Sequence, residues 1–202
     1  MIEETKIINP FIKCYLIGPM EKTKANDSGR GWRDKLRPDL ESRIDPNGNN
    51  VYVFDPTREE QNKVGLEPKA FHKKIQGWIQ GGNNDKVAEG TNLIWHGKTY
   101  LEPIDNDKNQ GKLVHIMGDI DYVRNSNFLI ARMEEGDQPC GTYMEVGIAL
   151  EHKIPIYVIQ TMPREIYPVS FVGAVFGTHG GFFDNPTQLL EFLDKQYKLK
   201  IK

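Results

Sequence analysis

The chain of 202 residues has few cysteines, little excess of either charge and no long hydrophobic run. Cys14 and Cys140 lie far apart beside apolar segments, which indicates two reduced, buried thiols rather than a disulfide framework. The net charge is −2 and basic residues are interspersed with acids, which excludes the basic footprint of a protein that binds a nucleic acid polymer. No apolar run approaches the length of a membrane span, and the first residues lack a signal peptide's apolar region. We therefore expect a soluble, cytoplasmic protein that does not engage a membrane.

Sequence motifs for common cofactors are also missing. The segment Gly18-Pro19-Met20 lacks the glycines of a dinucleotide fingerprint, and no lysine-bearing phosphate loop occurs anywhere in the chain. The five histidines have no spacing that is typical of metal ligands. We therefore expect neither a cofactor nor a metal ion.

Strand-like and helix-like apolar segments alternate along the chain. Strands are predicted over 11–17, 51–54, 128–133 and 154–159, with 171–176 as a candidate fifth, and helices over 31–43, 141–152 and 186–197, with a helical stripe over 113–123. This alternation predicts the α/β class, with a doubly wound, Rossmann- or flavodoxin-like parallel sheet of about five strands.

The chain length fits a single domain over residues 1–202, with an insertion at about 58–112 after the second strand. The insertion is polar and rich in glycine, with one amphipathic stretch around Phe71, Ile75, Trp78 and Ile79. Because a structureless loop of that length is unusual in a compact domain, we expect a helix, a small hairpin and a lid or subunit contact there.

Glu145 is a carboxylate inside an otherwise apolar predicted helix. The residues three and four positions away are Gly141, Thr142, Ile148 and Ala149, so no cationic helix neighbour can pair with it. Burying an unpaired carboxylate is costly, and structural cores usually avoid it. We therefore interpret Glu145 as a functional residue; the alternative is a glutamate that faces outward into solvent.

Ligands of parallel sheets bind beyond the carboxyl ends of the strands, and three conspicuous segments fall at such ends. One follows the first strand, one follows the second strand, and the loop 134–140 leads to the helix of Glu145. In that helix Thr142 is a candidate N-cap, although an ordinary helix start is an equal alternative. The substrate-binding candidates are Gly18, Pro19, Met20, Asp55, Asp137, Gly141 and Thr142.

Four more side chains have two interpretations each. Asp119 lies at the edge of the helical stripe, where a carboxylate can either reach a pocket rim or be solvated. Tyr15 lies inside the first strand, where a core tyrosine is the default. Arg30 and Arg33 near the first helix can meet a phosphate or a carboxylate, but a surface role is favoured.

Together these segments resemble the nucleoside 2-deoxyribosyltransferase family, which includes related deoxynucleotide N-glycosidases. The matching segments are Tyr15 to Met20, Asp119 with the helix to Asn127, the strand 128–131, and Gly141 to Ala149 with the pattern Gly-Thr-x-x-Glu-x-Gly-x-Ala. They cover about half of the chain. The chain departs from the family at Asn127, where an aspartate is common, and at Pro139, where transferases often have Asp and hydrolases Ser; Asp137 is a candidate substitute.

The resemblance implies an enzyme that cleaves the N-glycosidic bond of a 2′-deoxynucleoside or its 5′-monophosphate. By this match Glu145 is the nucleophile, and a covalent deoxyribosyl intermediate passes the sugar to another base. Asp119 matches an aspartate that holds the substrate and assists proton transfer to the leaving base, and Tyr15 matches an aromatic residue that orients the nucleophile. The implied partners are a nucleoside or nucleotide, a free nucleobase, and further copies of the chain in a homodimer or higher homo-oligomer.

Three alternatives stay open. A deoxynucleoside 5′-monophosphate N-glycoside hydrolase would pass the sugar to water, and transfer is only slightly favoured over it. A non-catalytic nucleotide or ADP-ribose sensor would keep the loops at Gly18 and Gly141 without using Glu145 as a nucleophile. An NAD glycohydrolase would cleave a related bond. The sequence does not disclose the base, the need for a 5′-phosphate or the role of residues 58–112.

Overall fold

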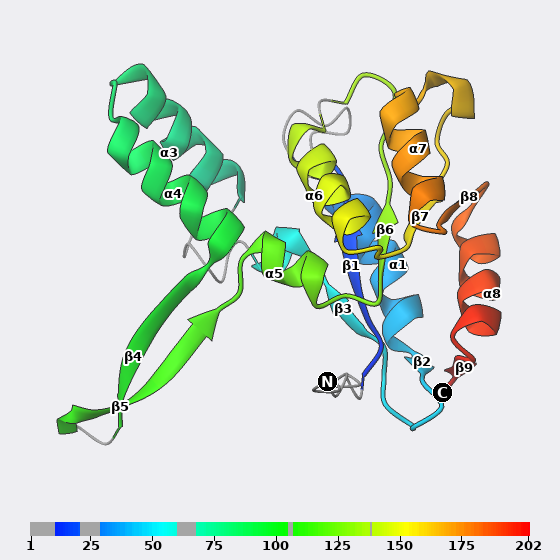
Figure 1. Ribbon diagram of the computed structural model, residues 1–202, viewed down its shortest axis with the longest axis horizontal. Helices are drawn as coiled ribbons and strands as arrows, with labels where there is room; N and C mark the ends of the chain where they lie inside the picture. The colour runs from blue at the N-terminus through cyan, green and yellow to red at the C-terminus, as the bar shows by residue number, and fades with distance from the viewer. Residues whose placement is uncertain (1–10, 21–28, 60–67, 105–106, 138) are drawn as a thin grey trace, which may run out of the picture.

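The computed structural model describes residues 11–20, 29–59, 68–104, 107–137 and 139–202, with the backbone alone at 68–69, 100–104 and 107–113. Within these residues a five-stranded parallel sheet runs in the order β3-β1-β6-β7-β8 (Figure 1). Its strands are β1 (Lys13–Ile17), β3 (Tyr52–Phe54), β6 (Phe128–Ala131), β7 (Ile156–Ile159) and β8 (Gly181–Phe183). The predicted α/β class with a parallel sheet of about five strands is confirmed.

Helices cover both faces of this sheet (Figure 1). They are α1 (Arg30–Glu41), α5 (Asp119–Arg124), α6 (Cys140–Glu151), α7 (Val169–Gly177) and α8 (Pro186–Gln196). Because side chains alternate along a strand, Cys14 and Leu16 of β1 pack with α1 and α8, whereas Tyr15 and Ile17 pack with α5, α6 and α7. Burial on both faces explains why the strands are continuous apolar runs. Among the described helices, none combines the length and apolar composition needed to cross a membrane.

Two predicted elements differ from the structure. Residues 171–176 belong to α7, which buries Phe171, Ala174 and Val175 at helical spacing, and the fifth strand is β8 instead. A short apolar run cannot be assigned to a strand or a helix from periodicity alone. The stripe over 113–123 is divided, since its first part completes the strand β5 (Asp107–Ile116) and only α5 is helical.

Two local expectations for α6 are also wrong. The helix begins at Cys140 after Pro139, so Thr142 is its third residue and not its N-cap. Cys14 is buried as expected, but Cys140 is exposed. A proline that precedes a helix supplies no side-chain cap, and the first turn of α6 therefore has no side-chain hydrogen bond from its N-cap residue.

The insertion forms two hairpins that extend from the main body (Figure 1). The helices α3 (Pro68–Gln80) and α4 (Asn84–His96) make the first, and β4 (Lys98–Ile104) pairs antiparallel with β5 to make the second. A helix and a hairpin were expected, and the structure shows a second helix. At Gly90 of α4 the absent side chain lets Phe71, Ile75 and Trp78 of α3 approach closely. These contacts give the helical hairpin a small core of its own.

The two ends of the β4–β5 hairpin cross at a pair of glycines. Gly97 precedes β4 with a φ of 67°, and Gly118 follows β5 and precedes α5. A Cβ on Gly97 would overlap the carbonyl oxygen of Ile116, and one on Gly118 would overlap the carbonyl oxygen of Trp95. Only residues without a side chain permit this approach, which attaches the insertion to the sheet-bearing body.

Arg33 of α1 is fully buried and joins α1 to the end of β1. Its Nη1 donates to the carbonyl oxygen of Gly29 at 2.6 Å and its Nη2 to that of Gly18 at 2.9 Å. Its Nε donates to the carbonyl oxygen of Leu16 at 3.3 Å and lies 3.9 Å from Oδ1 of Asp55. The surface role predicted for Arg33 is therefore wrong, because the backbone at the end of β1 supplies partners that no sequence pattern indicates.

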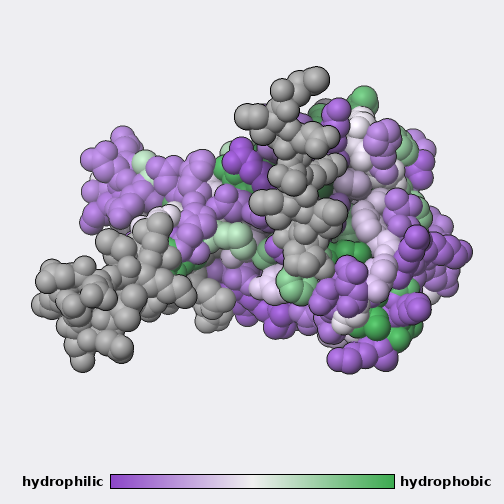
Figure 2. Space-filling model, turned by 60° about the horizontal axis from the view of Figure 1, so that its bottom comes forward, coloured by the Kyte–Doolittle hydropathy of each residue, from purple (hydrophilic) through white to green (hydrophobic). Residues whose placement is uncertain are grey.

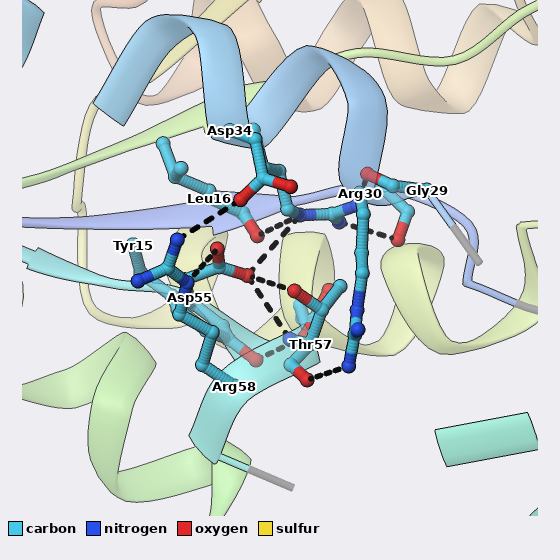
Figure 3. A network of polar contacts seen from close by, with 11 residues as sticks. Tyr15, Leu16, Gly29, Arg30, Asp34, Asp55, Thr57 and Arg58 are labelled. Carbon is cyan, nitrogen blue, oxygen red and sulfur yellow. Dashed lines mark hydrogen bonds and ion pairs between the residues drawn. The ribbon is translucent and has the colours of Figure 1, made fainter. Parts of the chain in front are cut away.

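Asp55 connects the same network to the end of β3 (Figure 3). Its Oδ1 accepts hydrogen bonds from the backbone N–H of Thr57 at 3.0 Å and from the Thr57 hydroxyl at 2.7 Å. Its Oδ2 lies 3.9 Å from Nε of Arg58, which pairs with Asp34 of α1. Arg30 also donates to the Thr57 carbonyl oxygen at 3.3 Å. These contacts fix the loop after β3 against α1.

We expect Gly97→Ala to destabilise the protein more than Gly48→Ala. Both glycines have positive φ, which costs an alanine about 1–2 kcal/mol, and the ψ of −156° at Gly97 lies in a region that is essentially restricted to glycine. At Gly48 a new Cβ meets nothing within 4 Å, whereas at Gly97 the overlap adds a further penalty of about 1–3 kcal/mol. Thermal unfolding of both variants measures the difference, and equal midpoints would contradict the close backbone crossing.

We expect Arg33→Met to destabilise the fold by about 3–5 kcal/mol, because three buried carbonyl oxygens lose their hydrogen-bond donor and Asp55 loses its buried cation and keeps only the half-exposed Arg58. Arg37→Met on the next turn of α1 is the matched control, since Arg37 pairs with Glu41 near the surface. That variant should lose less than about 1 kcal/mol. Urea unfolding compares the two, and similar losses would show that the buried network is not a principal source of stability.

Candidate functional site

A pocket with a volume of about 470 Å³ lies where the carboxyl ends of β1 and β3 and the start of α6 meet the insertion. The sheet-bearing body contributes Gly18, Pro19, Met20, Pro56 and Asp119, together with Pro139, Cys140, Gly141, Thr142 and Glu145. The helical hairpin contributes His72, Ile75, Gln76, Ile79, Thr91, Ile94 and Trp95. Figure 2 shows this hairpin beside the main body, with a mainly hydrophilic outer surface.

Glu145 is buried with 6% of its surface exposed, so the outward-facing alternative is wrong. On α6 the neighbouring residues Val146 and Ala149 enter the sheet core, and Glu145 turns toward the pocket. The hydroxyl of Tyr15 on β1 donates a hydrogen bond of 2.8 Å to Oε1 of Glu145. The carboxylate that its helix neighbours cannot pair thus meets a partner 130 residues earlier in the chain.

Tyr15 is fully buried behind Glu145 and holds the orientation of the carboxylate. Burial raises the pKa of the Tyr15 hydroxyl well above its usual value, and the nearby charges of Asp119 and Glu145 raise it further. The hydroxyl therefore stays protonated at any ordinary pH and remains a hydrogen-bond donor to Glu145. Tyr15 is both a core tyrosine and a contact of the candidate site.

Asp119 is the first residue of α5, is 5% exposed and lines the pocket. Asp121 accepts from the backbone N–H of Gly118 at 3.3 Å and fixes the start of the helix. Helices α5 and α6 pack against the same face of the sheet, so Asp119 and Glu145 enter one pocket from consecutive helices. The structure therefore brings together the two carboxylates that the sequence indicated separately.

Thr142 presents a buried polar atom to the same pocket. It is 2% exposed, and within the described part of the chain its Oγ1 has no hydrogen-bond partner. Buried hydroxyls are almost always hydrogen-bonded in proteins, so this atom is a natural contact for a bound ligand. Beside it, Gly141 lines the pocket, and a Cβ there would meet nothing within 4 Å.

Five of the seven predicted substrate contacts line the pocket, and so do the predicted catalytic residues Glu145 and Asp119. The five are Gly18, Pro19, Met20, Gly141 and Thr142. Asp55 and Asp137 are not among the described lining residues. Asp55 belongs to the Arg33 network, and Asp137 accepts from the backbone N–H of Glu134 at 2.7 Å, which closes a turn. A ligand contact for either residue stays a prediction.

A lid or a subunit contact was expected in the insertion, but no residue of the helical hairpin was predicted to line the pocket. The stretch from Phe71 to Ile79 was identified as amphipathic, but its periodicity does not say which part of the molecule its faces meet. Over the residues that the structure describes, no group of three or more His, Cys, Asp or Glu side chains could hold a metal ion.

Comparisons with known proteins give a fold likeness alone. No protein-family model matches the sequence, and no curated protein matches it. A conserved protein from Enterococcus faecalis V583 has a similar structure, with a TM-score of 0.53 and 14% identity over 92% of this chain and 99% of that one. The CMP N-glycosidase BcmB from Clostridium botulinum gives a TM-score of 0.45 at 13% identity over 91% and 98%, a likeness too distant to carry an argument. The first likeness agrees with the Rossmann-like α/β fold.

Proposed function

We propose that this chain cleaves the N-glycosidic bond of a 2′-deoxynucleoside, or its 5′-monophosphate, and transfers the sugar to another base through a covalent deoxyribosyl–Glu145 intermediate. The observation that carries the proposal is the 2.8 Å hydrogen bond from buried Tyr15 to Glu145, in a pocket that also contains buried Asp119. Most enzymes that break a glycosidic bond through an oxocarbenium-like transition state use a pair of carboxyl groups at one site.

In the first step an oxygen of Glu145 attacks the anomeric carbon of the sugar. The C1′–N bond breaks, its electron pair goes to the base nitrogen, and Asp119 delivers a proton to the departing base. The hydrogen bond from Tyr15 holds the carboxylate in place, which reduces the entropy lost on reaching the attack geometry. The negative charge of Glu145 stabilises the positive charge that develops on the sugar.

In the second step a nitrogen of the acceptor base attacks the same carbon and Glu145 departs as a carboxylate. The proton released by the acceptor returns to Asp119, so the enzyme is regenerated. If water takes the place of the base, the same sequence of steps hydrolyses the substrate. The Thr142 hydroxyl and the first-turn backbone of α6 are suited to bind a sugar hydroxyl or a phosphate.

We expect Glu145→Gln to abolish base release and base exchange, with a loss of about a thousandfold or more, because the amide is not a nucleophile. Glu151→Gln, an exposed position on the same helix, is the control and should keep full activity. Chromatography of deoxynucleosides and their monophosphates, with and without free adenine, provides the measurement.

Base exchange without net free sugar supports transfer, and sugar release regardless of adenine replaces transfer with hydrolysis. Equal activity in Glu145→Gln and wild type would remove Glu145 from the mechanism. No turnover of any compound by wild type would overturn the enzymatic proposal in favour of a nucleotide sensor.

We expect Tyr15→Phe to lower kcat by about 10–100-fold, because the carboxylate loses a hydrogen bond worth about 1–3 kcal/mol. Tyr157→Phe is the matched control, since it removes another buried tyrosine hydroxyl, 3.3 Å from that of Tyr197 on the opposite face of the sheet. That variant should lose stability without losing kcat. Parallel losses of kcat in both variants would mean that Tyr15 acts on the fold and not on Glu145.

A further inference from the structure

We propose that the α3–α4 hairpin determines which substrate the pocket binds, and we call its pocket-lining residues the specificity wall. This wall contacts the flat heteroaromatic ring of the substrate, and Gln76 forms hydrogen bonds with the polar edge of that ring. The proposal rests on the proposed function, in which this ring is the leaving or accepting nucleobase. It assigns a ligand-binding role to an insertion that lies outside the parallel sheet.

The hairpin turns one face of each helix toward the pocket. On α3 the lining residues His72, Ile75, Gln76 and Ile79 recur at intervals of three and four, which places them on one stripe. The lining residues of α4 have the same spacing, and they are Thr91, Ile94 and Trp95. Two helices with aligned stripes form a continuous wall opposite the sugar-binding residues.

The wall shares Ile75 with the contact that holds the two helices of the hairpin together. Ile75 packs with Phe71 and Trp78 around Gly90 and so contributes to the contact between α3 and α4. Ile79, in contrast, lines the pocket with 58% of its surface exposed, and Gln76 is exposed as well. A ligand that covers an apolar side chain exposed in a pocket removes it from water, which favours binding.

The chemistry of the wall fits a nucleobase better than a sugar or a phosphate. Trp95 offers an aromatic face on which a base can stack, and the isoleucines offer apolar contact to the flat ring. Within the described lining of the hairpin the polar groups are His72, Gln76 and Thr91, without a lysine or an arginine to bind a phosphate. The amide of Gln76 can donate and accept at once, as the edge of a base requires.

The opposite side of the pocket has the complementary character. Glu145, Asp119 and Thr142 present buried oxygens there, which suit the hydroxyl groups and the developing positive charge of a sugar. The volume of about 470 Å³ lies in the range of pockets that enclose small organic ligands. A nucleoside placed with its sugar at Glu145 therefore directs its base toward the hairpin.

The first test compares Gln76→Leu with Gln80→Leu. Both glutamines are exposed on α3 one helical turn apart, but only Gln76 is among the described lining residues. We expect Gln76→Leu to change the ratio of KM values between deoxyadenosine and deoxycytidine by about tenfold, with kcat much less affected, and Gln80→Leu to leave the ratio unchanged. An equal change for every base, or equal behaviour of the two variants, would overturn the role of Gln76.

The second test requires no turnover. Tryptophan fluorescence is followed while free adenine or cytosine is added to wild type, Trp95→Phe and Trp78→Phe. We expect a base-dependent signal that Trp95→Phe loses and Trp78→Phe keeps, because Trp95 lines the pocket and Trp78 packs in the hairpin. The absence of base binding, or a signal that depends on Trp78 alone, would overturn the specificity wall.

The two tests separate the two proposals. If wild type cleaves no nucleoside but binds bases with an affinity that Gln76→Leu alters, the wall stands and the catalytic proposal fails. If nucleosides are cleaved and Gln76→Leu has no base-dependent effect, the catalytic proposal stands and the wall fails.

Discussion

The buried guanidinium of Arg33 is the interaction on which the geometry of this protein depends. Removing such an ion from water costs several kcal/mol, and the cost is offset only when its N–H groups find acceptors. Here they donate to the carbonyl oxygens of Leu16, Gly18 and Gly29, and Asp55 lies within ion-pair distance. The loops after β1 and β3 are therefore tied to the start of α1, and Gly18 is held where it lines the pocket.

The opposite face of β1 faces the candidate site. Because side chains alternate along a strand, the strand that buries Leu16 on one side presents Tyr15 to α6 on the other. Tyr15 meets Glu145 there, and Asp119 enters from α5. The two layers of helices thus have different roles. Helix α1 fixes the ends of β1 and β3, and α5 and α6 on the other face carry Asp119 and Glu145. The proposed function is therefore placed in this site and in the hairpin, because a fold that many unrelated proteins share does not determine function.

Much of the fold could be read from the sequence, and the failures have a common cause. The sheet strands over 11–17 and 128–133 are apolar runs whose burial follows from local composition, so they were predicted correctly. The segment 171–176 has the same composition, yet its side chains pack at helical spacing against neighbours elsewhere in the chain. The stripe over 113–123 was divided because its first half pairs with β4. In each case contacts with another segment decided between two conformations that local composition does not distinguish.

By itself the sequence determined the α/β class and the position of Glu145 inside an apolar helix, because both depend on periodicity and on the cost of burying a charge. Only the tertiary structure decided what that carboxylate meets. Tyr15 lies 130 residues away, Arg33 is buried by carbonyl oxygens that any residue type could carry, and the insertion reaches the pocket through the crossing at Gly97 and Gly118. Contacts between distant segments are set by packing, and no local pattern encodes them.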